Sequence, residues 1–263
     1  MDQDGPSRDG HDRSGPGDDA ARRFRRHQAV RLPADGAGDG GSRSPGSPAR
    51  TGPGRMTAPA SPGSDRATQL YTAAVDLFMA NGYRDVDVAE IAAAAGASHG
   101  TFYNYFRNKR DVLTAIQATT EAQIIAAVSA PDGVPPPSTR DEFVDQVRDR
   151  IACAIAYFVE NAEFMAFVTL TAAGVDDDAL AATLTTHQRA AERFTRLFEH
   201  GREHGWVHPD LDLDVAGQAT VSAIITSVLP ALVDGADNVD VEEATALCAK
   251  YLLNGMRGLA DPR

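Results

Sequence analysis

The sequence VDVAEIAAAAGASHGTFYNYFRNKRDVL, residues 86–113, decides the fold of this chain. Its pattern predicts two short helices, a tight turn between them, and the start of a third helix. Asp87 and Glu90 have the spacing of a capping box at the start of the first helix. Val86 and Ile91 have the spacing of a hydrophobic staple around the same helix start.

The turn and the second short helix have their own signals. Gly96 follows an alanine-rich run, where a chain leaving a helix often needs a positive φ. Ser98 is then a good N-cap. Phe102 and Phe106 are four residues apart and share one face, which can point inward and leave the polar residues outside. Asn108 can cap the helix that follows.

These residues carry a resemblance to a known family. The matching runs are R-x-x-x-L-Y-x-A-A-x-x-L-F-x-x-x-G-Y at 66–83, E-I-A-x-x-A-G-x-S at 90–98 and G-T-F-Y-N-Y-F-x-N-K at 100–109. Together they resemble the DNA-binding domain of the TetR family of bacterial transcription regulators. Asp87 stands where the family usually has Thr or Ser, and Tyr105 where many members have His. The resemblance implies a helix-turn-helix unit followed by a helical domain for ligand binding and dimerisation.

The second short helix is predicted to enter a DNA major groove with its N-terminal end. Small hydroxyls reach phosphates or base edges, and a glycine lets the helix approach the sugar-phosphate backbone. Lys109 combines its charge with free backbone N–H groups at a helix start, which suits a phosphate anchor. The alternative is an ordinary short helix in a small bundle. The predicted DNA-binding residues are Ser98, His99, Gly100, Thr101, Tyr103, Asn104, Tyr105 and Lys109.

Composition divides the chain into three parts. Residues 1–63 are rich in Gly, Pro, Arg and Asp, and we predict a disordered tail. Translation starting at Met56 is the alternative for most of that stretch. Residues 64–113 form the predicted helix-turn-helix DNA-binding domain, and residues 114–263 the predicted ligand-binding and dimerisation domain.

Charge is distributed unevenly along the chain. The formal net charge is −12, but residues 66–113 hold five basic and five acidic groups. Residues 114–263 hold 10 basic and 23 acidic groups, which favours neutral or cationic ligands there. No apolar run approaches the roughly 18–20 residues of a membrane-spanning helix. We therefore expect a soluble, cytoplasmic protein with no membrane partner, and buried free thiols at Cys153 and Cys248.

Residues beyond Leu113 show only helical periodicity, so the predicted fold class is all-α. Helices are predicted to about Ala130 and then over 141–161, 162–173, 176–205, 214–234 and 239–259. The last two are strongly apolar. In TetR-like proteins such a pair builds a homodimer interface, and internal core is the alternative.

Aromatic residues and a histidine in the middle of this part suggest an apolar ligand pocket, with ordinary core as the alternative. The candidate pocket residues are Phe143, Phe158, Phe164, Phe167, His187 and Trp206. His200 and His204 lie one helical turn apart and could bind a metal, but a helix C-terminus also favours His. We predict no metal and no cofactor.

The predicted function is a ligand-responsive, DNA-binding transcription regulator. We expect a repressor that binds a palindromic operator in double-stranded DNA as a homodimer and is released by a small-molecule effector. The alternative is a helical ligand-binding or scaffolding protein without a DNA function. An enzyme is not expected, because paired carboxylates in an active-site context, a nucleophile elbow and a phosphate loop are all missing from the sequence.

Overall fold

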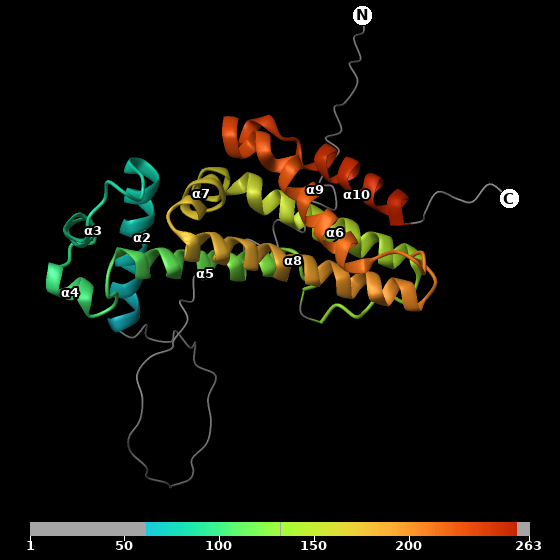
Figure 1. Cartoon of the computed structure of the whole chain (residues 1–263), viewed down its shortest axis with the longest axis horizontal. Coiled ribbons are helices and arrows are strands. Elements are labelled where there is room, and N and C mark those ends of the chain that lie inside the picture. The colour runs from blue at the N-terminus through green and yellow to red at the C-terminus, as the bar shows by residue number, and fades with distance from the viewer. Residues whose placement is uncertain (1–61, 132, 257–263) are drawn as a thin grey trace, which may run out of the picture. The chain divides into compact units, whose positions relative to one another are not determined.

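The structure is a computed structural model that describes residues 62–131 and 133–256. Every regular element within those residues is helical, which confirms the predicted all-α class (Figure 1). They form two compact units, one ending at Ile116 and the other beginning at Gln117. The predicted tail, and with it the alternative start at Met56, lies outside the described residues up to position 61.

The smaller unit is built from three helices and the start of a fourth. These are α2 (Pro62–Asn81), α3 (Val88–Ala94), α4 (His99–Tyr103) and the first two turns of α5 (Lys109–Ala127). Each helix contributes buried side chains to a single core, among them Leu70, Phe78, Ile91, Phe102, Leu113 and Ile116. Tyr83 closes this core after α2, with its ring edge-to-face against Phe78 at a centroid distance of 5.1 Å.

The larger unit contains the rest of α5 and five further α-helices. They are α6 (Arg140–Glu160), α7 (Ala162–Ala166), α8 (Asp177–Glu203), α9 (Leu213–Asp234) and α10 (Val241–Met256). The prediction of one regular helix over 162–173 was wrong. After α7 the chain forms a π-helical turn, η1 (Phe167–Thr171), and a 3₁₀ turn, η2 (Ala172–Gly174). Phe167 and Val168, at the start of the π turn, are both buried.

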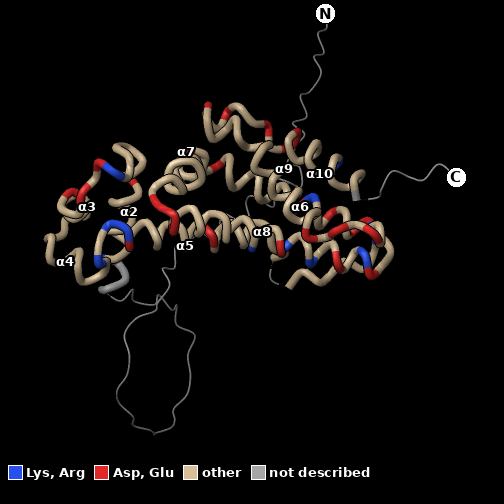
Figure 2. Tube along the Cα trace, in the orientation of Figure 1, with Lys and Arg blue, Asp and Glu red and all other residues tan. Residues whose placement is uncertain are grey.

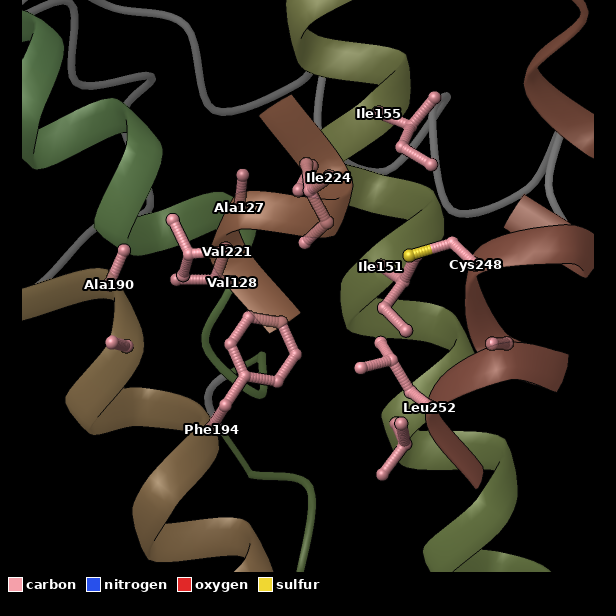
Figure 3. Packing of buried hydrophobic residues seen from close by; sticks show 14 of the residues in the cluster. Ala127, Val128, Ile151, Ile155, Ala190, Phe194, Val221, Ile224, Cys248 and Leu252 are labelled. Carbon is pink, nitrogen blue, oxygen red and sulfur yellow. The ribbon is translucent and has the colours of Figure 1, made fainter. Parts of the chain in front are cut away.

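Helix α6 lies in the middle of the larger unit's core. Figure 3 shows Ile151 of α6 facing Cys248 and Leu252 of α10, with Ile224 of α9 and Phe194 of α8 directed into the same interior. Both cysteines are free thiols, as predicted, but only Cys248 is buried and Cys153 is half-buried. Burial raises the pKa of the Cys248 thiol to about 11, so it stays protonated at neutral pH.

Helix α9 corrects the expectation that no apolar segment of this chain approaches the length of a membrane-spanning helix. By length and composition its 22 residues could cross a membrane, and so could α6 taken together with the sharply bent segment after it. However, α9 packs against α6, α8 and α10 through Val221, Ile224 and Val228. Core helices of this kind pass the same length and composition test.

The closest approach of α8 and α9 occurs at Gly217. A Cβ atom there would lie 2.5 Å from Thr195 Oγ1 and 2.7 Å from the Ala191 backbone oxygen. Thr195 Oγ1 also donates a hydrogen bond to the Leu213 carbonyl at 3.2 Å, which ties the two helices together at the same place. Only glycine fits this crossing without moving backbone.

We predict that Gly217→Ala lowers the free energy of unfolding by about 1–3 kcal/mol, because overpacking against backbone cannot be relieved by a side-chain rotation. Urea unfolding followed by circular dichroism measures the change. Gly255→Ala is the control, since a Cβ at that helical glycine meets nothing within 4 Å. The control should be neutral or stabilising by up to about 1 kcal/mol. Equal effects of the two substitutions would contradict the close crossing.

Candidate nucleic-acid interface and ligand cavity

Helix α3 begins with a complete capping box. The Asp87 carboxylate accepts a hydrogen bond from the Glu90 backbone N–H, and the Glu90 carboxylate accepts one from the Asp87 N–H, both at 2.8 Å. Val86 and Ile91 are buried on either side of this cap, as the predicted hydrophobic staple requires. Asp87 therefore performs the capping role that the sequence assigned to it, and it leaves α3 with a defined start.

The turn between α3 and α4 is fixed from both sides. Gly96 has a φ of +60°, the left-handed conformation expected at the end of α3. The Ala97 N–H donates to the Ala92 carbonyl at 2.8 Å, which closes the end of the helix. From α2, Arg66 Nη1 donates to the Ala95 carbonyl at 3.1 Å. Ser98 Oγ then accepts the Thr101 N–H at 3.1 Å and caps α4, as predicted.

Helix α4 has a buried side and an exposed side. Phe102 is fully buried and its ring lies 5.7 Å from that of Phe106, so this face holds the helix to the core. The opposite face carries Tyr103 and, just after the helix, Tyr105, with exposed fractions of 50% and 38%. Seven of the eight predicted DNA-binding residues lie between positions 98 and 105, and six of these seven are exposed. Thr101 is half-buried, with its hydroxyl 2.7 Å from Ser98 Oγ.

Gly100 lies on the exposed side of α4 and is not required by the fold. A Cβ at this position would meet only Ser98 Oγ, at 3.8 Å, an ordinary van der Waals distance. Its φ is not positive, so the backbone does not demand glycine either. The lack of a side chain therefore leaves the start of α4 open to close approach from outside.

Lys109 has a different role from the other predicted site residues. Its ammonium donates to the backbone carbonyls of Tyr83, Arg84 and Val86 at 2.8, 3.0 and 2.8 Å. The same nitrogen lies 4.7 Å from the centroid of the Tyr83 ring. A lysine ammonium has three donors, and all three are used within the unit. Lys109 thus holds the segment between α2 and α3 and supplies positive charge, but no free donor.

A cavity in the larger unit lies between α5, α6, η1 and α8. The space within it that the centre of a water molecule can reach is about 20 Å³, and the whole hollow, with its open mouth, is about 340 Å³. Hydroxyl, amide and carboxylate groups form much of its wall. The polar lining residues are Gln117, Thr120, Glu121, Thr169, Thr183 and Thr186.

The other lining residues include two of the six predicted pocket residues, Phe158 and His187. Burial lowers the pKa of His187, so its imidazole is neutral at neutral pH. Among the described residues, neither ring nitrogen of His187 has a hydrogen-bond partner. Phe164 and Phe167 are near the same helices but contribute to the surrounding core rather than to the lining.

Phe143 and Trp206 belong to a separate aromatic cluster at the end of α8. Their ring centroids lie 5.8 Å apart, and Trp206 stacks on His204 at 4.7 Å. His200 Nε2 is bonded to the Pro137 carbonyl at 2.8 Å, and His204 Nδ1 to the His200 carbonyl at 2.8 Å. The described residues contain no group of three or more metal-ligating side chains, so the His pair is part of a helix end.

Sequence reasoning missed most of the polar cavity wall. Ile116, Gln117, Thr120 and Ile124 follow one another at steps of one, three and four, so the two polar residues continue the inward face of α5. Gln117 and Thr120 are buried, with exposed fractions of 7% and 1%. Polar residues on the inward face of a helix were the available signal, because buried polar groups need a specific reason.

Comparison with known proteins agrees with this arrangement. Residues 70–116 match the model of the family described as bacterial regulatory proteins, tetR family. Residues 70–116 are therefore a TetR-family domain. A fatty acid metabolism regulator protein of Bacillus subtilis (strain 168) is 40% identical over 57 residues, which cover 22% of this chain. The chain spans only 29% of that relative's length in the match.

Solved structures extend the likeness in fold to both units. The fatty acid degradation regulator FadR from Bacillus halodurans gives a TM-score of 0.60 at 19% identity, covering 76% of this chain and 99% of its own. FadR from Bacillus subtilis, solved in complex with stearoyl-CoA, gives 0.59 at 19% identity over 72% and 98% of the two chains. At this identity the likeness is one of fold.

We predict that Lys109→Ala destabilises the protein by about 1–3 kcal/mol, because it leaves backbone carbonyls around Tyr83 and Val86 without their donor. Arg148→Ala is the control. Its guanidinium forms an exposed ion pair with Asp145 at 3.7 Å, and its loss should cost no more than about 0.5 kcal/mol. Urea unfolding followed by circular dichroism measures both variants. Similar losses in the two would show that the Lys109 ammonium is not a structural contact.

Proposed function

We propose that this chain is a DNA-binding transcription regulator, most simply a repressor, that acts as a homodimer on a palindromic operator and responds to a small-molecule effector. The observation that carries the proposal is the exposed face of α4. Its hydroxyl, amide and imidazole groups contribute nothing to the core, while Phe102 on the opposite face holds the helix in place. Groups of these kinds reach base edges and phosphates in a major groove.

The charge of the smaller unit suits this function. Residues 66–113 hold equal numbers of basic and acidic groups, so binding depends on local donors rather than on a strong field. Arg84 and Arg107 are exposed and can meet phosphates. The Lys109 ammonium adds charge next to them while holding its own segment.

A helical ligand-binding or scaffolding protein without DNA function is the second candidate. Footprinting on the DNA flanking the chain's own gene separates the two, because a dimeric regulator should protect two half-sites related by a dyad. A purified protein that retains no genomic fragment at low salt would favour the second candidate. An enzymatic role has no support in the described residues, and a cytoplasmic location follows from the proposed work on DNA.

We predict that Gly100→Ala weakens binding to the footprinted operator by about tenfold or more, because a methyl group on the open side of α4 obstructs close approach to DNA. Thermal stability should be unchanged or slightly higher, since alanine is the better helix former. Gly174→Ala is the control for a glycine with open space in the other unit. Fluorescence anisotropy at one fixed salt concentration measures both variants. Unchanged affinity in Gly100→Ala would contradict a close approach at this residue.

The proposed dimer interface is an uncharged face of α9. Helical geometry places Val215, Leu229 and Val233 on one side of the helix, within about 40° of each other around its axis. All three are exposed, at 59%, 42% and 65%. Ala219, Ser222 and Thr226, also exposed, fill the same side. On α10, Leu247 and Tyr251 are exposed at 62% and 78%, which makes a neighbouring apolar contact surface.

We predict that Leu229→Asp raises the dimer dissociation constant by about a hundredfold or more, because the interface would bury an unpaired carboxylate. Light scattering after size exclusion measures the mass of the particle. Leu184→Asp is the matched control, a leucine on α8 with a comparable exposed fraction of 52%, and should leave the dimer unchanged. A Leu229→Asp protein that stays dimeric at micromolar concentration would rule out this face.

The cavity of the larger unit is the proposed effector site. Polar and apolar side chains both line it, and helix α5 contributes Gln117, Glu121 and Ile124 to the lining. A ligand that binds better to one arrangement of this unit shifts the population of that arrangement. Because α5 continues from the smaller unit, such a shift offers a route to operator release. FadR from Bacillus subtilis was solved with stearoyl-CoA, but the lining of the present cavity lacks the lysine or arginine that the phosphates of such a ligand require.

A further inference from the structure

Hydrogen-bond acceptors dominate the polar wall of the cavity. The hydroxyls of Thr183 and Thr186 donate to the carbonyls of Ala179 and Ala182 at 3.1 and 3.0 Å. Each threonine therefore presents only oxygen lone pairs to the cavity. Gln117 Nε2 also donates to the Ala179 carbonyl, at 2.9 Å, so its amide keeps an acceptor oxygen and one further N–H. A ligand that uses the oxygens of Gln117, Thr183 and Thr186 has to supply donors.

The Glu121 carboxylate is a negative charge that a ligand in the cavity can reach. Glu121 lines it, and no lysine or arginine is among the lining residues. The Glu121 carboxylate is paired with Arg189 on α8, whose side chain is 58% exposed. An ion pair with so solvated a partner is weak, so a cation inside the cavity can compete with Arg189 for the carboxylate. Glu121 itself is only 22% exposed and stays at the wall.

Two further features suit a cation. His187 is neutral through burial, so it adds no positive charge that would repel one. The Phe158 side chain lines the same space and offers an aromatic surface to an ammonium group. The surrounding unit is strongly acidic: residues 117–256 contain 22 Asp and Glu against 8 Lys and Arg. Figure 2 shows acidic residues distributed along its helices.

An acyl-CoA requires a binding site of different chemistry. Its phosphates require lysine or arginine donors, and its long acyl chain requires an apolar tunnel. This cavity is small, and its lining includes the Glu121 carboxylate but no lysine or arginine. A change in ligand charge is compatible with the shared fold, because fold alone does not determine ligand chemistry.

We propose that the cavity binds a small organic ammonium ligand, with Glu121 as its counter-ion and the oxygens of Gln117, Thr183 and Thr186 as acceptors for its N–H groups. The identification of this ligand as the effector rests on the proposed regulatory function. The proposed binding of an ammonium ion in the cavity does not depend on that function, and it can be tested separately.

The test compares ligands of matched shape and opposite charge on the full-length protein. Phenethylammonium is paired with phenylacetate, benzylammonium with benzoate, and lauroyl-CoA serves as the acyl-CoA. Titration calorimetry at neutral pH should show that at least one ammonium ion binds and that its matched carboxylate and lauroyl-CoA do not. The proposal is overturned if neither ammonium ion binds more tightly than about 1 mM. It is also overturned if either carboxylate or the acyl-CoA binds as well as the ammonium ions.

Glu121→Gln locates the binding. The amide keeps the shape of the side chain and can still accept a hydrogen bond from Arg189, so the fold should survive. Ammonium binding should weaken by about tenfold or more once the charge is gone. Glu192→Gln is the control, because Glu192 also pairs with an arginine, Arg196, at 3.9 Å but lies outside the cavity lining. Equal affinity in the Glu121→Gln protein overturns the assignment.

Operator release, measured with the same preparation, distinguishes the two proposals. A protein that retains no DNA but binds the ammonium ion through Glu121 has the predicted cavity chemistry without the proposed regulatory function. A protein that binds its operator and releases it with lauroyl-CoA or a carboxylate, but with neither ammonium ion, is a regulator whose ligand class is wrong here.

Discussion

A helix of five residues does not persist alone in water, because too few hydrogen bonds offset the cost of ordering its backbone. Helix α4 therefore exists only because its surroundings hold it. Ser98 supplies the N-terminal cap, and Phe102 is fully buried against the small core. Once Ser98 and Phe102 are held in place, the other side chains of α4 are directed away from the core and toward solvent. The exposed polar face is thus a consequence of how the short helix is anchored.

The anchoring of α4 depends in turn on contacts from more distant parts of the chain. Arg66 of α2 closes the end of α3, and Lys109 of α5 bonds three carbonyls in the segment that precedes α3. Both contacts are made by long basic side chains whose charge would otherwise be free for DNA. In this unit, Arg66 and Lys109 stabilise the helices and turns that hold α4, and the exposed face of α4 carries uncharged polar side chains. This division explains how a unit with no net basic excess in residues 66–113 can still present a binding face.

The parts predicted correctly from the sequence were those governed by local rules. The capping box at Asp87, the cap at Ser98 and the inward face of Phe102 and Phe106 follow from spacing alone. The bonds of Lys109 did not follow, because its partners are 23–26 residues away along the chain. The π turn after α7 was missed for the same kind of reason. The residues of η1 are apolar or small and alone suggest a regular helix, so nothing in the local sequence indicated the change to a π turn.

The cavity shows how aromatic residues mislead a reading of sequence. Four of the six predicted pocket residues proved to be core or part of the Trp206 cluster, since aromatic side chains bury well wherever helices meet. The wall is made instead by threonines that bond their own helix and by Gln117 and Glu121 on α5. A threonine that donates to the backbone four residues earlier is compatible with an interior because its proton is already satisfied. The oxygen lone pair that remains can accept a hydrogen bond from a donor in the cavity. The acidic groups are concentrated in residues 114–263, whereas residues 66–113 carry equal numbers of basic and acidic groups. In the proposed regulator, the larger unit would therefore attract cations and discourage non-specific contact with DNA, and the smaller unit would depend on its local donors to recognise an operator.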